Sequence, residues 1–187
     1  MDVLIAGSWH KQNFISKIKN PKMFELVKNN NYQINNRYYF IKEFYEDIKL
    51  DLSIFYNYFN ISSTDSSIKL YNDIKQFNIV FLHTQTSINK INFKNYIDKF
   101  IELEDHIIIC ANENVYNKNS VKHELCELYV NLLVPHYIDI IYNSKYIYMV
   151  DSCFSTIIIP LLYMKKINPI ECKIFDRDYG LNILNND

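Results

Sequence analysis

Three short polar stretches carry the residue types that hold or transfer polar groups in proteins. They are residues 83–87 (His-Thr-Gln-Thr-Ser), 112–114 (Asn-Glu-Asn) and 151–155 (Asp-Ser-Cys-Phe-Ser). Each stretch closes or follows an apolar run that predicts a buried strand, over residues 78–83, 106–111 and 146–150. Ligand sites of parallel α/β sheets lie at the carboxyl ends of the strands. The three stretches therefore predict one polar rim.

The third stretch stands between a predicted strand and an apolar helix. Asp151 and Ser152 are both favoured at helix N-caps, where exposed backbone N–H groups attract anions. We expect Ser152, Ser155 and these N–H groups to hold a phosphate or diphosphate, with Asp151 orienting the turn. The simpler alternative is a structural N-cap, worth about 1 kcal/mol to the helix.

The first stretch offers hydroxyl and amide groups to phosphate or sugar oxygens, from Thr84, Gln85, Thr86 and Ser87. His83 is the candidate general acid or base, because the pKa of histidine ordinarily lies close to neutral pH. The alternative is a polar loop whose hydroxyls cap the next helix.

The second stretch places an amide and a carboxylate on the same predicted rim. We expect Asn112 and Glu113 to contact a ligand, because acidic residues bond ribose hydroxyls in dinucleotide-binding folds. A solvated loop is the competing interpretation.

Ser152 or Cys153 also suggests a hydrolase, since a nucleophile at the start of a helix is activated there. That hypothesis requires a histidine within hydrogen-bonding reach of the nucleophile. None lies near in the sequence.

Other constellations predict no site. Cys110, His123 and Cys126 lack the fourth ligand and the paired spacing of structural zinc sites, so no metal is expected. Residues 176–178 (Asp-Arg-Asp) are expected to be a solvated loop. With only 2 glycines, at positions 7 and 180, the chain has no glycine-rich phosphate loop.

The elements that must position the rim alternate from residue 75 onward. Apolar runs predict strands at residues 78–83, 106–111, 132–134, 146–150 and 173–175. Helical patterns fall at residues 66–75, 92–103, 138–144 and 157–164, with a helix or loop at residues 122–128. This order predicts a Rossmann-like, three-layer α/β domain with a mostly parallel sheet. Residues 50–55 alternate, which predicts an extended segment.

Composition and the distribution of residue types indicate the domain division, the partners and the location of the protein. We divide the chain into an aromatic-rich segment or reduced lobe at 1–74 and the α/β domain at 75–187. The 20 basic and 21 acidic residues leave no basic footprint for nucleic acid. The longest apolar stretch is too short for a membrane span. Absence of a signal peptide or of paired cysteines predicts a cytoplasmic protein.

The rim and its order resemble the C-terminal, nucleotide-sugar-binding domain of GT-B glycosyltransferases, especially the heptosyltransferase-like group. The resemblance covers about residues 40–165 and rests on the polar loop after the strand at 78–83 and on the turn formed by Asp151 and Ser152. It implies metal-independent sugar transfer from a nucleotide-sugar substrate, with no further cofactor.

The chain departs from that family in two ways. Cys153 and Phe154 stand where the family has a glycine or small residue, and Ser155 and Thr156 stand where a histidine is common. A chain of 187 residues also cannot hold two complete Rossmann-like domains. It therefore needs a homo-oligomer or partner subunit, or has lost the transfer reaction. The alternative function is a non-catalytic Rossmann-like interaction module.

Overall fold

A four-stranded, all-parallel sheet forms the centre of the molecule. The computed structural model describes residues 45, 48–51, 53–86 and 90–175. The strands stand in the order β2-β1-β3-β4. Their bounds are β1 (Asn78–His83), β2 (His106–Cys110), β3 (Tyr146–Val150) and β4 (Glu171–Phe175). The predicted Rossmann-like α/β fold with a parallel sheet is therefore confirmed.

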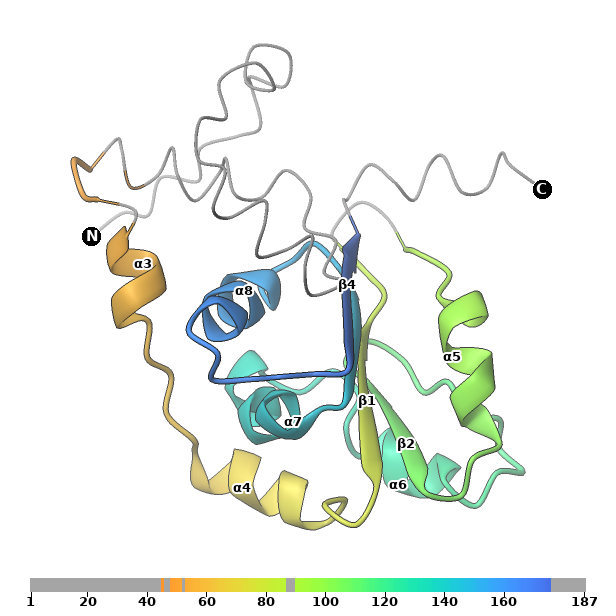
Figure 1. Ribbon diagram of the computed structural model, residues 1–187. Coiled ribbons are helices and arrows are strands. Elements are labelled where there is room, and N and C mark those ends of the chain that lie inside the picture. The colour runs from red at the N-terminus through yellow and green to blue at the C-terminus, as the bar shows by residue number, and fades with distance from the viewer. Residues whose placement is uncertain (1–44, 46–47, 52, 87–89, 176–187) are drawn as a thin grey trace, which may run out of the picture.

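Helices lie on both faces of this sheet. In Figure 1, α5 (Lys94–Ile101) lies on one face, and α7 (Ile138–Asn143) and α8 (Ser155–Tyr163) lie on the other. The remaining helices are α3 (Ser53–Tyr58), α4 (Asp65–Asn72), α6 (His123–Glu127) and the 3-10 helix η2 (Val134–Tyr137). Within the described residues, no helix has the length and apolar character needed to cross a membrane.

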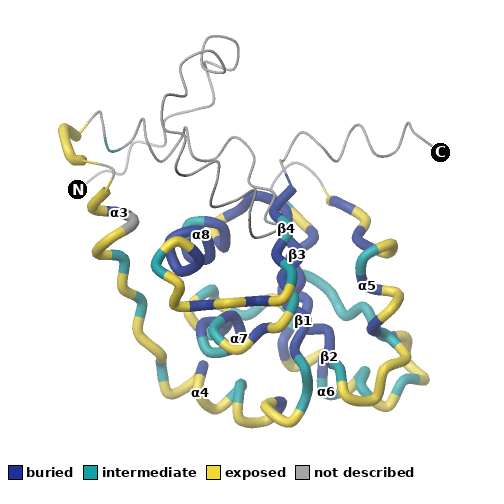
Figure 2. Tube along the Cα trace, viewed as in Figure 1, coloured by how far each residue is buried: buried dark blue, intermediate teal, exposed yellow. Residues whose placement is uncertain are grey.

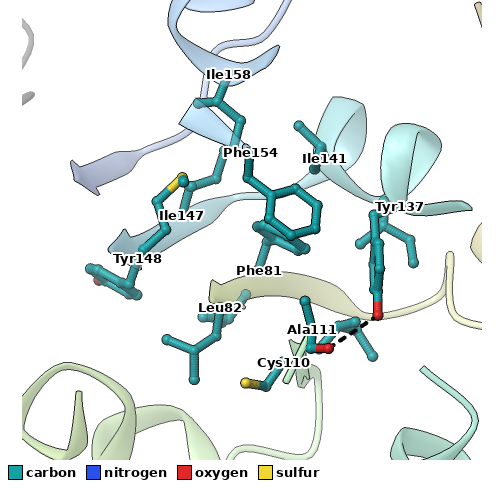
Figure 3. Close-up of a cluster of buried hydrophobic side chains, with 14 of the residues drawn as sticks. Phe81, Leu82, Cys110, Ala111, Tyr137, Ile141, Ile147, Tyr148, Phe154 and Ile158 are labelled. Carbon is teal, nitrogen blue, oxygen red and sulfur yellow. Dashed lines mark hydrogen bonds between the residues drawn. The ribbon is translucent and has the colours of Figure 1, made fainter. Parts of the chain in front are cut away.

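Strands β1, β2 and β3 are almost wholly buried because both faces are covered, which explains their apolar runs, whereas β4 also carries the half-buried ion pair of Glu171 and Lys173 (Figure 2). On the face of α7 and α8, Phe81, Tyr137 and Phe154 pack edge to face, with ring centroids 5.2–5.8 Å apart (Figure 3). Phe154 thus anchors the turn after β3 to the centre of the sheet.

The predicted strand at residues 132–134 is wrong. Leu132 donates its N–H to the Tyr137 hydroxyl rather than to a strand, at 3.1 Å. The 3-10 helix η2 begins at Val134 instead, and Pro135, which has no N–H, lies in its first turn. The Tyr137 hydroxyl in turn donates to the Tyr129 carbonyl at 2.5 Å. A buried side chain therefore takes the backbone groups that a strand would have used.

The predicted extended segment at residues 50–55 is also wrong in its second half, because α3 begins at Ser53. Asp51 directs this change: its carboxylate accepts the Ser53 N–H at 2.7 Å and its carbonyl accepts the Ile54 N–H at 3.0 Å. Phe55 is then buried against Tyr45 and Phe59. Local capping overrides the alternating pattern here.

A carboxylate joins α4 to the sheet-covering helix α7. Asp139, in the first turn of α7, accepts hydrogen bonds from the hydroxyls of Ser63 and Ser67. Ser67 is fully buried and forms a capping box with Thr64 at the start of α4. These contacts attach residues 63–67 to the α/β domain. The division of the chain at residue 74 stays a prediction.

We predict that Asp139→Ala lowers the free energy of unfolding by about 1–3 kcal/mol, because the buried Ser67 hydroxyl loses a charged partner. Urea unfolding followed by circular dichroism measures the change. Asp98→Ala is the matched control, since Asp98 forms only an exposed i,i+4 ion pair with Lys94 and should cost at most about 0.5 kcal/mol. Equal losses in the two variants would contradict the proposed attachment.

Candidate functional site

The candidate site lies at the topological switch point of the sheet. From β1 the chain crosses through α5 to β2 on one side, and then returns through α7 to β3 on the other side of β1. The loops that follow β1 and β3 therefore leave in opposite directions, at the point where α/β folds bind ligands. His83 ends β1 there, and Asp151 follows β3 directly.

The loops after β1 and β2 are joined by Asn112. Its side-chain oxygen accepts the backbone N–H of Thr84 at 3.0 Å and that of Gln85 at 3.3 Å. The predicted strand 106–111 is one residue shorter, so Ala111 lies in the loop, but its N–H still donates to Leu82. This pairing holds Asn112 beside β1.

Glu113 adds a charged group to the same junction. One of its carboxylate oxygens accepts the Thr84 hydroxyl at 3.1 Å, and the other lies 2.5 Å from the Lys90 ammonium. Lys90 returns to this point through a β-bridge with Gln85. Since Lys90 is 57% exposed, this ion pair faces solvent.

His83 and Ser152 join the loops after β1 and β3. Nδ1 of His83 lies 3.1 Å from Oγ of Ser152, and both residues are buried, with exposed fractions of 6% and 5%. The contact follows from the parallel pairing of β1 and β3, in which His83 is opposite Met149. Ser152, three residues further on, therefore lies just beyond the end of β1.

The turn after β3 is closed by its own side chains. The Ser155 hydroxyl donates to the Asp151 carboxylate at 2.5 Å, and Ser155 Oγ accepts the Ser152 N–H at 2.9 Å. The Phe154 N–H donates to Ser152 Oγ at 3.3 Å. The predicted N-cap at Asp151 or Ser152 is therefore wrong: α8 begins at Ser155, its N-cap is Phe154, and no side chain caps the helix, because the side chains of the turn bond one another.

Burial makes His83 uncharged at neutral pH. Desolvation lowers the pKa of His83 from 6.5 to about 4, against a hydrogen bond with the Val150 backbone that raises it. The ring of Phe154 packs on the imidazole, with centroids 4.8 Å apart. An uncharged imidazole keeps a lone pair that accepts a proton.

The structure brings together most of the predicted site residues, in two adjoining groups. One group contains Thr84, Gln85, Asn112 and Glu113, and the other contains His83, Asp151, Ser152 and Ser155. Thr86 is half-buried next to the first group, whereas Ser87 lies outside the described residues.

Lys90 and Phe154 also contact these groups, and neither residue is predicted from the sequence. The sequence gives little indication that Lys90 lies at the site, because its β-bridge with Gln85 depends on how the chain folds back between the two residues. The contact of Phe154 with His83 depends on which strands are neighbours, so the sequence does not indicate it.

No group of three metal-binding side chains is found among the residues that the structure describes. Burial raises the pKa of the Cys110 thiol, and it raises the pKa of Cys126 to about 12, so both thiols stay protonated. Residues 176–178 and both glycines lie outside the described residues.

No family model, curated protein or solved structure gave a match to this chain. The fold is therefore established by its own strand order and helix placement.

We predict a pH dependence of stability that arises at His83. The unfolded chain takes up a proton near pH 6.5, whereas the buried imidazole stays uncharged down to about pH 4. The unfolded state therefore binds more protons in this window, and the free energy of unfolding should fall as pH decreases through it, by a few kcal/mol.

The measurement is urea unfolding at pH 7, 6, 5 and 4.5, for the wild-type chain and for His83→Gln. Carboxylates titrate in both proteins, so the difference between the two profiles isolates His83. Parallel profiles would show that His83 is not protected from protonation.

Proposed function

We propose that the joined loops after β1, β2 and β3 bind a nucleotide-sugar or a similar phosphate-bearing small molecule, in a glycosyltransferase-like protein. The observation that carries this proposal is the convergence of all three loops at the switch point, through the contacts of Thr84 with Glu113 and of His83 with Ser152. Ligands of parallel α/β folds bind at this position. The resemblance to the GT-B nucleotide-sugar domain supplies the ligand class.

The residue types fit the two parts of such a ligand. The N-terminus of α8, with Ser152 and Ser155, offers hydroxyls and a positive helix end to a diphosphate. Asn112 and Glu113 are suited to bond ribose or sugar hydroxyls. Lys90 places a cation beside Glu113, where it moderates the negative charge of the carboxylate.

In this proposal His83 is the general base for the acceptor hydroxyl. Its imidazole is uncharged at neutral pH and so has a lone pair for the proton, while the pKa of about 4 makes it a weaker base than a histidine in water. Transfer would be independent of metal, with backbone N–H groups and hydroxyls stabilising the leaving diphosphate as fixed dipoles.

A second candidate is a non-catalytic module that associates with another protein. Large apolar side chains are exposed between β2 and α7: Val121 is 95% exposed, Leu128 63% and Leu133 71%. All three come from the segment that joins β2 to η2, and contiguous exposed apolar surface is typical of association sites. This candidate requires no nucleotide affinity.

The test is thermal unfolding of the chain with UDP, GDP, ADP and CMP and their sugar conjugates. A ligand at 100 times its dissociation constant adds about 2.7 kcal/mol, which should raise Tm by about 5–10 °C. Ser152→Ala removes a donor to the phosphate and should weaken binding about tenfold or more.

Ser120→Ala is the control, because Ser120 lies in the loop between β2 and α6, outside the predicted site. The Ser120→Ala variant should bind the nucleotide as tightly as the wild-type chain does. If no nucleotide class shifts Tm, the ligand proposal fails and the interaction module is favoured.

A further inference from the structure

The buried contact between His83 and Ser152 has the form of a nucleophile and its base. Oγ of Ser152 lies 3.1 Å from Nδ1 of His83, within the range at which a base activates a hydroxyl. The two residues are 69 positions apart and come from neighbouring parallel strands. The rigid centre of the sheet therefore fixes their separation.

The base is itself oriented by a third group. Phe154 packs against the imidazole of His83, with ring centroids 4.8 Å apart, and the Val150 backbone raises the pKa of His83 against the lowering by burial. In the tautomer with the proton on Nε2, Nδ1 carries the lone pair that faces Ser152. Nucleophile, base and orienting group are the three parts that activated serines share across unrelated folds.

The residue after Ser152 supplies a free donor. Cys153 is exposed, and its N–H donates no hydrogen bond within the described part of the chain. In strand–turn–helix nucleophile sites, the N–H of the residue after the nucleophile forms part of the oxyanion hole. Ser152 stands in such a turn, between β3 and α8.

We propose that Ser152 is the nucleophile and His83 the general base of an acyl-transfer site that hydrolyses carboxylic esters. The Ser152 oxygen attacks the ester carbonyl and passes its proton to His83, while the Cys153 N–H holds the oxyanion. The bond to the leaving alcohol breaks, and His83 protonates that alcohol. Water then attacks the acyl-serine, gives a proton to His83, and releases the acid as Ser152 recovers its proton.

An uncharged ester fits this pair better than a phosphoester. The base is an uncharged imidazole, and the free donor is a single backbone N–H, which matches the one oxyanion of a carbonyl addition. Phosphoryl transfer calls for several cationic groups around three equatorial oxygens. The activity does not depend on nucleotide binding, so it goes beyond the function proposed above.

A fluorophosphonate probe tests the proposal, because it phosphonylates an activated serine oxygen with loss of fluoride. Mass spectrometry of the digested wild-type chain should find the label on Ser152, and this result needs no variant to fold. Ser152→Ala should remove the label. His83→Gln should slow labelling about 100-fold or more. Ser120→Ala should label at the wild-type rate.

An unlabelled Ser152 overturns the proposal, and so does a folded His83→Gln variant that labels at the wild-type rate. The labelling is done without nucleotide, so it is separate from the thermal-shift panel. A label on Ser152 with no nucleotide shift supports the esterase and rejects the nucleotide site. A nucleotide that raises Tm, together with an unlabelled Ser152, rejects the esterase alone.

Discussion

The parallel pairing of β1 with β2 on one side and β3 on the other is the constraint on which the rest of the structure depends. It sends α5 and α7 to opposite faces and leaves the loops after β1 and β3 to diverge from one point. The register of β1 against β3 determines which side chains meet at this point, because His83 is paired with Met149 and so lies next to the turn at Ser152. A slip of one residue would turn His83 to the opposite face of the sheet.

Burial at this end of the sheet explains why its polar groups contact one another. A buried hydroxyl, amide or imidazole without a partner costs about 1–3 kcal/mol, so the loops fold to satisfy each group. Asn112 accepts two backbone N–H groups, and Ser155 bonds both Asp151 and the Ser152 backbone. His83 differs from these groups, because desolvation lowers its pKa and leaves the imidazole uncharged, so that it does not require a counterion. Burial therefore explains both the hydrogen bonds within these loops and the uncharged state of His83.

The parallel fold could be predicted from the sequence because its strands are short, apolar and separated by helical patterns. β1 has the predicted bounds, and the rim residues follow the predicted strand ends. The false strand at residues 132–134 shows the limit, since the Tyr137 hydroxyl that takes the Leu132 N–H is placed by tertiary packing. The same limit applies to the contact of His83 with Ser152, which depends on which strands are neighbours. Sequence periodicity predicts strands, but it does not give their order.

The strand order also explains why the fold alone does not select a function. An order of 2-1-3-4 has the same switch point as nucleotide-binding folds with more strands, and many chemistries use that position. The two proposed functions differ in what each requires of the Ser152 hydroxyl. A phosphate ligand must exchange places with His83 to reach this hydroxyl, which costs an existing hydrogen bond of about 0.5–1.5 kcal/mol. The acyl transfer that we propose needs no such exchange, because it uses the contact of Ser152 with His83 as it stands. The resting geometry at this one contact is thus compatible with the acyl transfer that we propose for Ser152, while the surrounding loops carry the polar groups that the proposed ligand requires.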